Sequence, residues 1–230
     1  MKPWQITLEE RLSSNDAPAV LSRDLITRFA RAEHGHALAP SSLTYWLRST
    51  KARGKLAPIQ RGLFLNRFRS PAGQLADATP WLRVDAIVSL NSVLGDAGVL
   101  NNPSRVVTAV VPMDRQAPPP RLGRQRTQAG MFHFFGIPRR ILAAGDPVDR
   151  LDQSGKWEHP RATSEKALLD WLYLAASPRS HRTWPPRTDI DLTLLDSRRL
   201  ARLAKTAGLG SVLADWLKNS ATDIRINNVL

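Results

Sequence analysis

The chain has 230 residues, of which 42% are hydrophobic, enough to bury the cores of one or two folded domains. A formal net charge of +13 favours polyanionic partners, with nucleic acid ahead of acidic proteins and anionic membranes. The absence of cysteine excludes disulfides and thiol catalysis, and no apolar run resembles a signal peptide or a transmembrane helix, so we expect a cytoplasmic protein without membrane contact.

Two amphipathic helices are predicted at the start of the chain. Apolar residues around Ile6–Leu12 suggest a short helix that ends at the turn Ser13–Pro18. From Val20 to Glu33, apolar residues recur at helical spacing with arginines between them, which predicts a second helix. Gly35 is expected to end it.

The next segment predicts a helix and a hairpin in immediate succession. A helix is expected over Ser41–Arg53, with its N-cap in the Pro40-Ser41-Ser42 break. Four residues at helical spacing form its expected inward stripe: Leu43, Trp46, Leu47 and Thr50. Two extended runs follow, Lys55–Gln60 and Leu63–Phe68, joined by an Arg-Gly turn.

A helix followed at once by a hairpin is the second half of a winged helix-turn-helix, a fold that places one helix in the DNA major groove. Residues 1–70 carry 12 Lys or Arg against 5 Asp or Glu, so this domain is basic in its own right. The sequence therefore predicts a DNA-binding domain. The residues expected to contact DNA are Ser41, Ser42, Thr44, Tyr45, Arg48, Lys51, Arg53, Lys55 and Arg61.

These residues divide into two expected roles, because phosphate contacts position a protein and base contacts specify sequence. The serines at the helix start suit phosphate through hydroxyl and backbone N–H groups. Thr44, Tyr45 and Arg48 are expected at base edges, with Arg48 able to bind guanine through two hydrogen bonds. The remaining cations, Lys51, Arg53, Lys55 and Arg61, are expected at phosphates.

A stretch rich in proline and small residues over 71–80 reads as a linker between domains at 1–70 and 81–230. The second domain is predicted to mix helices and strands, which gives an α/β (α+β) fold class overall. The expected elements are a helix near Trp81–Leu94, strands at Arg105–Val111, Met131–Phe135 and Ile137–Leu142, a helix capped by Thr163 or Ser164, one capped by Asp196 or Ser197, and a last one near Val212.

Three segments of the chain resemble the AbiEi family of antitoxins from bacterial abortive-infection systems. The first is the wing pattern, Gly54-Lys55-Leu56 through Ile59, Arg61-Gly62 and Phe64. The others are Val84–Val111, similar to the opening of that family's second domain, and ATSEKALLDWLYL at Ala162–Leu174, similar to its A-x-x-E-K-A-L-L-D helix.

The resemblance implies a non-catalytic antitoxin of a type IV toxin–antitoxin system that needs no cofactor. The N-terminal domain would bind inverted repeats in its own promoter and repress the operon. The C-terminal domain would counteract a nucleotidyltransferase-like toxin encoded next door. A solitary winged-helix regulator without a toxin stays open as an alternative.

Two alternatives from other classes stay open. Asp189 and Asp191 could hold the metals of a nucleotidyltransferase or nuclease, although no Gly-Ser turn precedes them and a capping role is favoured. His34 and His36 lack a third ligand nearby, so no metal site is predicted. The other alternative is a protein-interaction module with an acidic partner.

Two loops carry candidate partner-binding residues. Arginines gather in the loop from Pro118 to Arg126, which could be a solvated loop, extend the DNA footprint or meet an acidic toxin. Trp184, in the loop Ser177–Thr188, could mark a partner contact or a packed hinge. The loop arginines are Arg121, Arg124 and Arg126.

Overall fold

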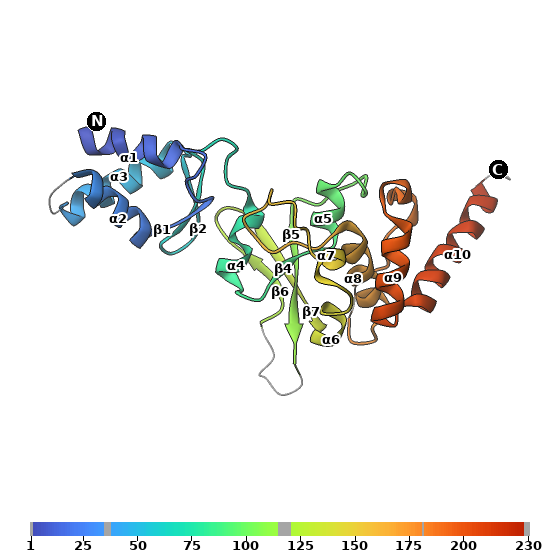
Figure 1. The fold of residues 1–230 in the computed structure, drawn as a ribbon. Coiled ribbons are helices and arrows are strands. Elements are labelled where there is room, and N and C mark those ends of the chain that lie inside the picture. The colour runs from blue at the N-terminus through green and yellow to red at the C-terminus, as the bar shows by residue number, and fades with distance from the viewer. Residues whose placement is uncertain (1, 35–37, 115–120, 181, 228–230) are drawn as a thin grey trace. The chain divides into compact units, whose positions relative to one another are not determined.

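In the computed structural model the chain forms two compact units (Figure 1). The structure describes residues 2–34, 38–114, 121–180 and 182–227, with side chains as far as residue 218. Unit 1 comprises Met1–Leu82 and Gln125–Met131, and unit 2 comprises Arg83–Arg124 and Phe132–Leu230. The architecture is α+β, as predicted. Within the described residues no helix combines the length and the apolar character needed to cross a bilayer.

The first part of unit 1, residues 3–66, combines three helices with a small antiparallel sheet. Its elements are α1 (Pro3–Ser13), β1 (Val20–Ser22), α2 (Arg23–His34), α3 (Pro40–Ala52), β2 (Leu56–Gln60) and β3 (Leu63–Asn66). The strand order is β1-β3-β2. The predicted helix over Val20–Glu33 was wrong at its start, because residues 20–22 pair with β3 as a strand and the helix begins only at Arg23.

One side of α3 is packed into the core of unit 1. All four residues of its predicted inward stripe are buried, and Trp46 lies against Trp4 of α1 and stacks on Phe68, with ring centroids 6.4 and 6.1 Å apart. The Thr50 hydroxyl is satisfied within the helix, where it donates to the Trp46 carbonyl at 2.9 Å. Burial of large side chains on one stripe leaves the opposite side of the helix to solvent.

The stretch predicted as a linker is partly folded. It contains a 3-10 helix, η1 (Leu75–Ala78), and the start of a short helix, α4 (Thr79–Leu82). Ala76 and Ala78 are buried, and the Asp77 carboxylate accepts a hydrogen bond from the Gln74 amide at 2.7 Å. These small residues are therefore packed within unit 1.

Unit 2 is built on a four-stranded mixed sheet with the order β4-β5-β7-β6. β5 and β7 are parallel, and β4 is antiparallel to β5. The strands are β4 (Ile87–Val88), β5 (Val107–Met113), β6 (Gly123–Arg126) and β7 (Met131–Pro138). The helices are α5 (Asn91–Asp96), α6 (Arg139–Leu142), α7 (Pro147–Arg150), α8 (Ser164–Ala176), α9 (Ser197–Ala207) and α10 (Gly210–Asn227), with short 3-10 turns η2 (Arg187–Asp189) and η3 (Leu192–Leu194).

Three predicted elements of unit 2 were wrong. The helix over Trp81–Leu94 is interrupted, because β4 pairs with β5 and Leu90 has a positive φ of 60° before α5 begins. The strand over Ile137–Leu142 is instead the end of β7 followed by α6. The loop expected from Pro118 to Arg126 ends in strand β6, while its residues up to 120 lie outside the described part of the chain.

Candidate nucleic-acid interface

The outer face of α3 is exposed along its length. Thr44, Tyr45, Arg48 and Lys51 are all exposed, and Tyr45 shows 71% of its surface to solvent. These four residues are the part of the predicted DNA surface that the helix itself presents. Their exposure follows directly from the seating of the opposite stripe in the core.

The start of α3 differs from the expectation. The helix begins at Pro40, with Ala39 as the N-cap residue and no side chain capping it. Proline suits the first helical position because its φ is already helical and its missing N–H has no partner there. Ser41 and Ser42 therefore lie in the first turn, where Ser41 is exposed and Ser42 is half-buried.

A cleft of about 790 Å³ lies between α1 and α3. Its lining includes Lys2 and Gln5 on the α1 side and Ser41 and Ser42 on the α3 side. Tyr45, Ser49 and Arg53 also line it, so the cleft runs along α3 on its α1 side.

Arg53 is paired inside unit 1, unlike the other predicted cations. Its guanidinium donates to both carboxylate oxygens of Glu9, at 2.6 and 3.3 Å. This hydrogen bond raises the pKa of Arg53 above its ordinary value, against an opposing effect of partial burial. Glu9 also accepts from the Trp46 indole at 3.1 Å, so the pair fastens α1 to α3.

The remaining predicted cations carry no such partner. Arg48, Lys51, Lys55 and Arg61 are exposed, and in the described part of the chain none of their side chains forms an ion pair or a hydrogen bond. Arg61 lies in the two-residue turn of the hairpin, before Gly62, whose φ is 76°. The helix and the hairpin thus present unpaired positive charge together.

One cation beside this surface was missed by sequence reasoning. Arg23 opens α2, and its guanidinium donates to the Thr44 hydroxyl at 3.4 Å. The same hydroxyl donates to the Pro40 carbonyl at 2.9 Å, so its proton is used within α3. The sequence gives no signal for this contact, because it joins residues from two helices.

The predicted partner-binding residues lie outside α3 and its hairpin and are exposed. Arg121, Arg124 and Arg126 are exposed, and Trp184 shows 48% of its surface. The loop around Trp184 is fixed on both sides of it. The Trp171 indole donates to the Thr183 carbonyl at 2.8 Å, and the Trp216 indole donates to the Pro185 carbonyl at 3.1 Å.

Arg182, in the same loop, is held over aromatic rings. Its guanidinium lies 4.5 Å from the ring centroids of both Phe135 and Trp171, and it also contacts the Asn91 side chain. Burial lowers the pKa of Arg182 to about 10. Burial, and then the charges of Arg182 and Arg124, also lower the pKa of His133 below its ordinary value.

The two aspartates of the enzyme alternative have local roles. Asp191 caps η3, accepting from the Thr193 amide at 2.9 Å and from its hydroxyl at 2.6 Å, and these bonds lower the pKa of Asp191. The Asp189 carboxylate accepts a long hydrogen bond of 3.4 Å from Asn102. Across the described residues no cluster of three or more His, Asp or Glu side chains could hold a metal ion.

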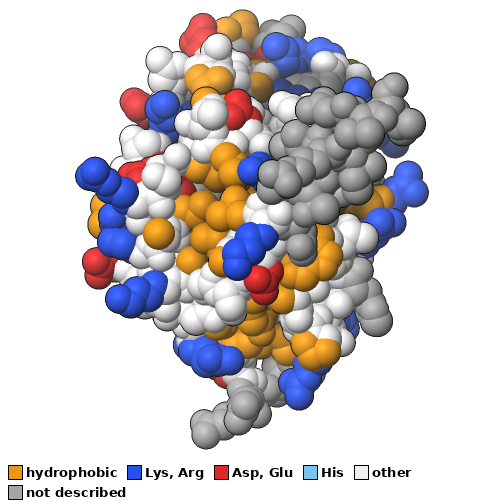
Figure 2. Space-filling view, turned by 90° about the vertical axis from the view of Figure 1, so that its right-hand side faces the viewer, with side chains coloured by type: hydrophobic (Ala, Val, Ile, Leu, Met, Phe, Trp, Pro, Cys, Tyr) orange, Lys and Arg blue, Asp and Glu red, His pale blue; other side chains and the backbone are white. Residues whose placement is uncertain are grey.

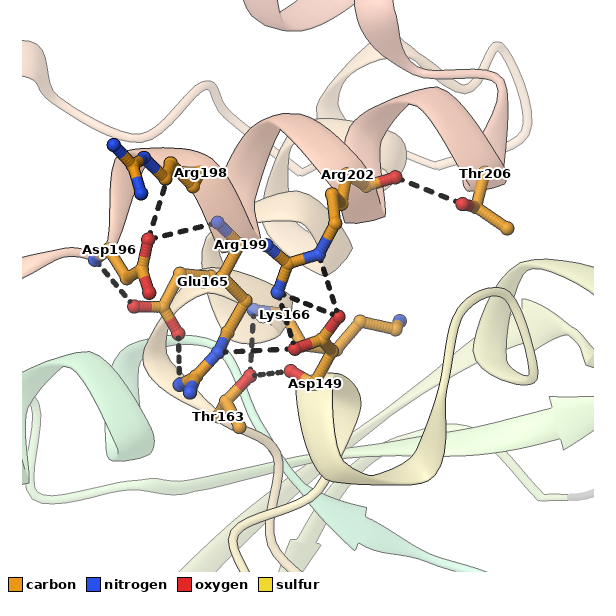
Figure 3. A network of polar contacts seen from close by, with 9 residues as sticks. All are labelled: Asp149, Thr163, Glu165, Lys166, Asp196, Arg198, Arg199, Arg202 and Thr206. Atoms are coloured by element: carbon orange, nitrogen blue, oxygen red, sulfur yellow. Dashed lines mark hydrogen bonds and ion pairs between the residues drawn. The ribbon is translucent and has the colours of Figure 1, made fainter.

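The A-x-x-E-K-A-L-L-D segment forms the buried helix α8 and a polar network around its start (Figure 3). The Thr163 hydroxyl caps the helix by accepting from the Lys166 amide at 3.3 Å, and Glu165 accepts from the Asp196 amide at 2.8 Å. Lys166 forms a buried ion pair with Asp170, which also accepts from the Ser89 hydroxyl at 2.8 Å. The segment therefore acts as framework within unit 2.

The same network ties α7 to α9. Arg202 donates to both carboxylate oxygens of Asp149, at 2.9 and 3.2 Å, and Arg199 reaches Glu165 at 3.4 Å (Figure 3). On the side of the molecule that carries α9 and α10, hydrophobic side chains gather in one area while lysines and arginines stand apart from one another (Figure 2).

Comparison with protein-family models and with curated protein sequences finds no match. Among solved structures, the chain is similar to the crystal structure of the RV2827C protein from Mycobacterium tuberculosis, with 19% identity and a TM-score of 0.55. The similarity covers 92% of this chain and 78% of that one. At this identity it shows a shared α+β fold.

Proposed function

We propose that unit 1 is a winged helix-turn-helix that binds double-stranded DNA, with α3 in the major groove and the β2–β3 hairpin against the backbone. The observation that carries the proposal is the unpaired, exposed charge on both elements, at Arg48, Lys51, Lys55 and Arg61. The element order α1-β1-α2-α3-β2-β3, with strands ordered β1-β3-β2, supports it, since a winged helix-turn-helix places its recognition helix directly before the wing.

The dimensions of α3 suit the major groove. A helix with its side chains is about 10–12 Å across, and the major groove is about 12 Å wide. Tyr45 and Arg48 are the residues that would read base edges, and the Thr44 methyl group would supply an apolar contact. Lys51, Lys55 and Arg61 would bind phosphates, while Arg53 would keep α1 in place through Glu9.

Fluorescence anisotropy with a labelled duplex from upstream of the protein's own gene tests the proposal. If Lys51, Lys55 and Arg61 each neutralise one phosphate, the logarithm of the affinity should fall with the logarithm of salt concentration at a slope of about −3. Arg48→Ala should weaken binding and relax sequence preference, whereas Arg28→Ala, an exposed cation of α2, is the matched control. Absence of salt-dependent binding by the wild-type protein would refute the proposal.

We further propose that the protein is an autorepressor and antitoxin of a type IV toxin–antitoxin system, acting in the cytoplasm beside the DNA it regulates. This role rests on the resemblance in the wing and in α8. Because Glu165, Lys166 and Asp170 are buried, the α8 part of that resemblance concerns the framework of unit 2 and not a contact surface. Trp184, exposed on a fixed loop, is the residue of unit 2 best suited to touch a toxin.

Co-expression with the product of the neighbouring gene separates the antitoxin from a solitary regulator. A toxin would arrest growth when expressed alone, and the wild-type protein would restore it. Arg48→Ala should still restore growth while losing repression of a promoter reporter. A neighbouring product that leaves growth unaffected would favour the solitary regulator.

A further inference from the structure

We propose that Arg23 binds a DNA phosphate between the recognition helix and the hairpin, an inference that rests on the proposed DNA-binding function of unit 1. Arg23 is the first residue of α2 and follows β1 directly. It is exposed, and no carboxylate pairs with it in the described part of the chain.

The backbone places Arg23 beside the hairpin turn. Ser22 pairs with Leu63, and the Arg23 amide donates to the Gly62 carbonyl at 2.7 Å. A Cβ at Gly62 would lie 3.8 Å from the Cβ of Arg23, so the two chain segments are in contact. The start of α2 and the turn that carries Arg61 therefore occupy one place on the surface of unit 1.

The side chain of Arg23 extends from that place to α3. One guanidinium nitrogen lies 3.4 Å from the Thr44 hydroxyl, one helical turn before Arg48. The guanidinium has five N–H donors, and this long, neutral contact uses one of them. The others are free to form charge-assisted hydrogen bonds with a phosphate, which are stronger than bonds between neutral groups.

Arg23 thus links the two charged elements of the proposed interface. Its backbone contacts Gly62, the residue after Arg61 on the hairpin. Its side chain contacts Thr44, one turn before Arg48 on α3. The contact with Thr44 also restricts the conformations of the arginine before DNA arrives. A side chain that is already restricted loses less freedom when it binds.

A phosphate contact predicts a defect that does not depend on sequence. Arg23→Ala should weaken binding about tenfold on both the upstream duplex and a scrambled duplex of the same composition, and should make the salt slope shallower by about 1. Arg48→Ala should instead reduce the difference between the two duplexes. Arg28→Ala, from the exposed side of the same helix, should leave affinity and slope unchanged.

The variants distinguish this inference from the function on which it rests. If the wild-type protein binds and Arg23→Ala matches Arg28→Ala in affinity and slope, the role of Arg23 is refuted and the proposed function stands. If the wild-type protein does not bind either duplex, both are refuted. Arg23→Gln, which keeps the length and polarity of the side chain, should reproduce the alanine defect, and equal urea midpoints would show that both variants are folded.

Discussion

The Glu9 carboxylate contacts the Arg53 guanidinium through both of its oxygens, at 2.6 and 3.3 Å. This pairing separates Arg53 from its charged neighbours on α3. We therefore expect Arg53→Ala to leave the salt slope of DNA binding close to that of the wild type, whereas Lys51→Ala, at a proposed phosphate contact, should make it shallower by about 1. A shallower slope in Arg53→Ala would show that the guanidinium leaves Glu9 to bind phosphate.

The same substitution should have a small effect on stability. The Arg53 side chain is 43% exposed, and partly exposed ion pairs contribute about 0–1 kcal/mol. Urea denaturation monitored by circular dichroism should detect a change in the free energy of unfolding within that range. Glu9→Gln keeps the size of the side chain and a hydrogen-bond acceptor, so it is the matched control for the loss of charge.

The Lys166–Asp170 pair in α8 should be sensitive to loss of either charge. Both side chains are at least 95% buried, and removal of one partner leaves the other charge without compensation. Asp170→Asn should lower the free energy of unfolding by about 3–5 kcal/mol, as measured by urea denaturation. The double variant Lys166→Met with Asp170→Asn removes the stranded charge and should recover part of that loss. A single variant as stable as the wild type would contradict this account.

Unit 2 should lose stability in acid. Hydrogen bonds from Arg202 lower the pKa of Asp149, and the backbone amide of Arg199 lowers the pKa of Asp196. A carboxyl group whose pKa is lower in the folded protein stabilises the fold above its unfolded pKa, near 3.9, and loses that effect as pH falls further. Urea midpoints should be flat from pH 7 to about 5 and fall below about pH 4.

Asp149→Asn provides the control for the pH experiment. This variant should be less stable than the wild type at neutral pH, since Arg202 loses its charged partner. Its urea midpoint should then fall less between pH 6 and pH 3, because one of the titrating groups is gone. Parallel curves for the two proteins would show that Asp149 does not contribute to the acid transition.

Substitutions of Trp184 and of Trp171 should differ in their effect on stability. Trp184→Ala removes a side chain that is 48% exposed and should change the thermal midpoint little. Trp171→Phe removes the hydrogen bond to the Thr183 carbonyl and should lower the free energy of unfolding by about 1–2 kcal/mol. A large loss in Trp184→Ala would identify it as a packed hinge instead of a contact residue.

The sequence predicted those elements whose signals are local. The stripe of α3, with Trp46 at its centre, and the Thr163 cap of α8 follow from spacing and cap chemistry within single segments. The helix expected over Trp81–Leu94 was wrong because Ala86, Leu90 and Val93 have helical spacing, yet Ala86 precedes strand β4, Leu90 has a positive φ and Val93 lies in α5. The pairing of β4 with β5 interrupts the expected helix, and residues 87–88 alone give no sign of this pairing.

The candidate site shows the same division. Arg48 and Lys51 are exposed because they lie opposite the buried stripe, and the spacing of that stripe can be read from the sequence. The pairing of Arg53 depends on Glu9, 44 residues away, and the position of Arg23 depends on a strand register that brings Gly62 to the start of α2. Contacts of this kind come from tertiary structure, so spacing along one helix could not predict them.

The β2–β3 turn consists of only two residues, with Arg61 as its single cation. A hairpin this short holds the backbone but cannot add many base contacts, so α3 would read about three or four base pairs by itself. A DNA sequence of that length recurs by chance throughout any genome, which offers about 10⁶ or more non-specific sites that compete for each protein. Selective repression would then require two copies of the chain on one operator, which ties regulation to protein concentration.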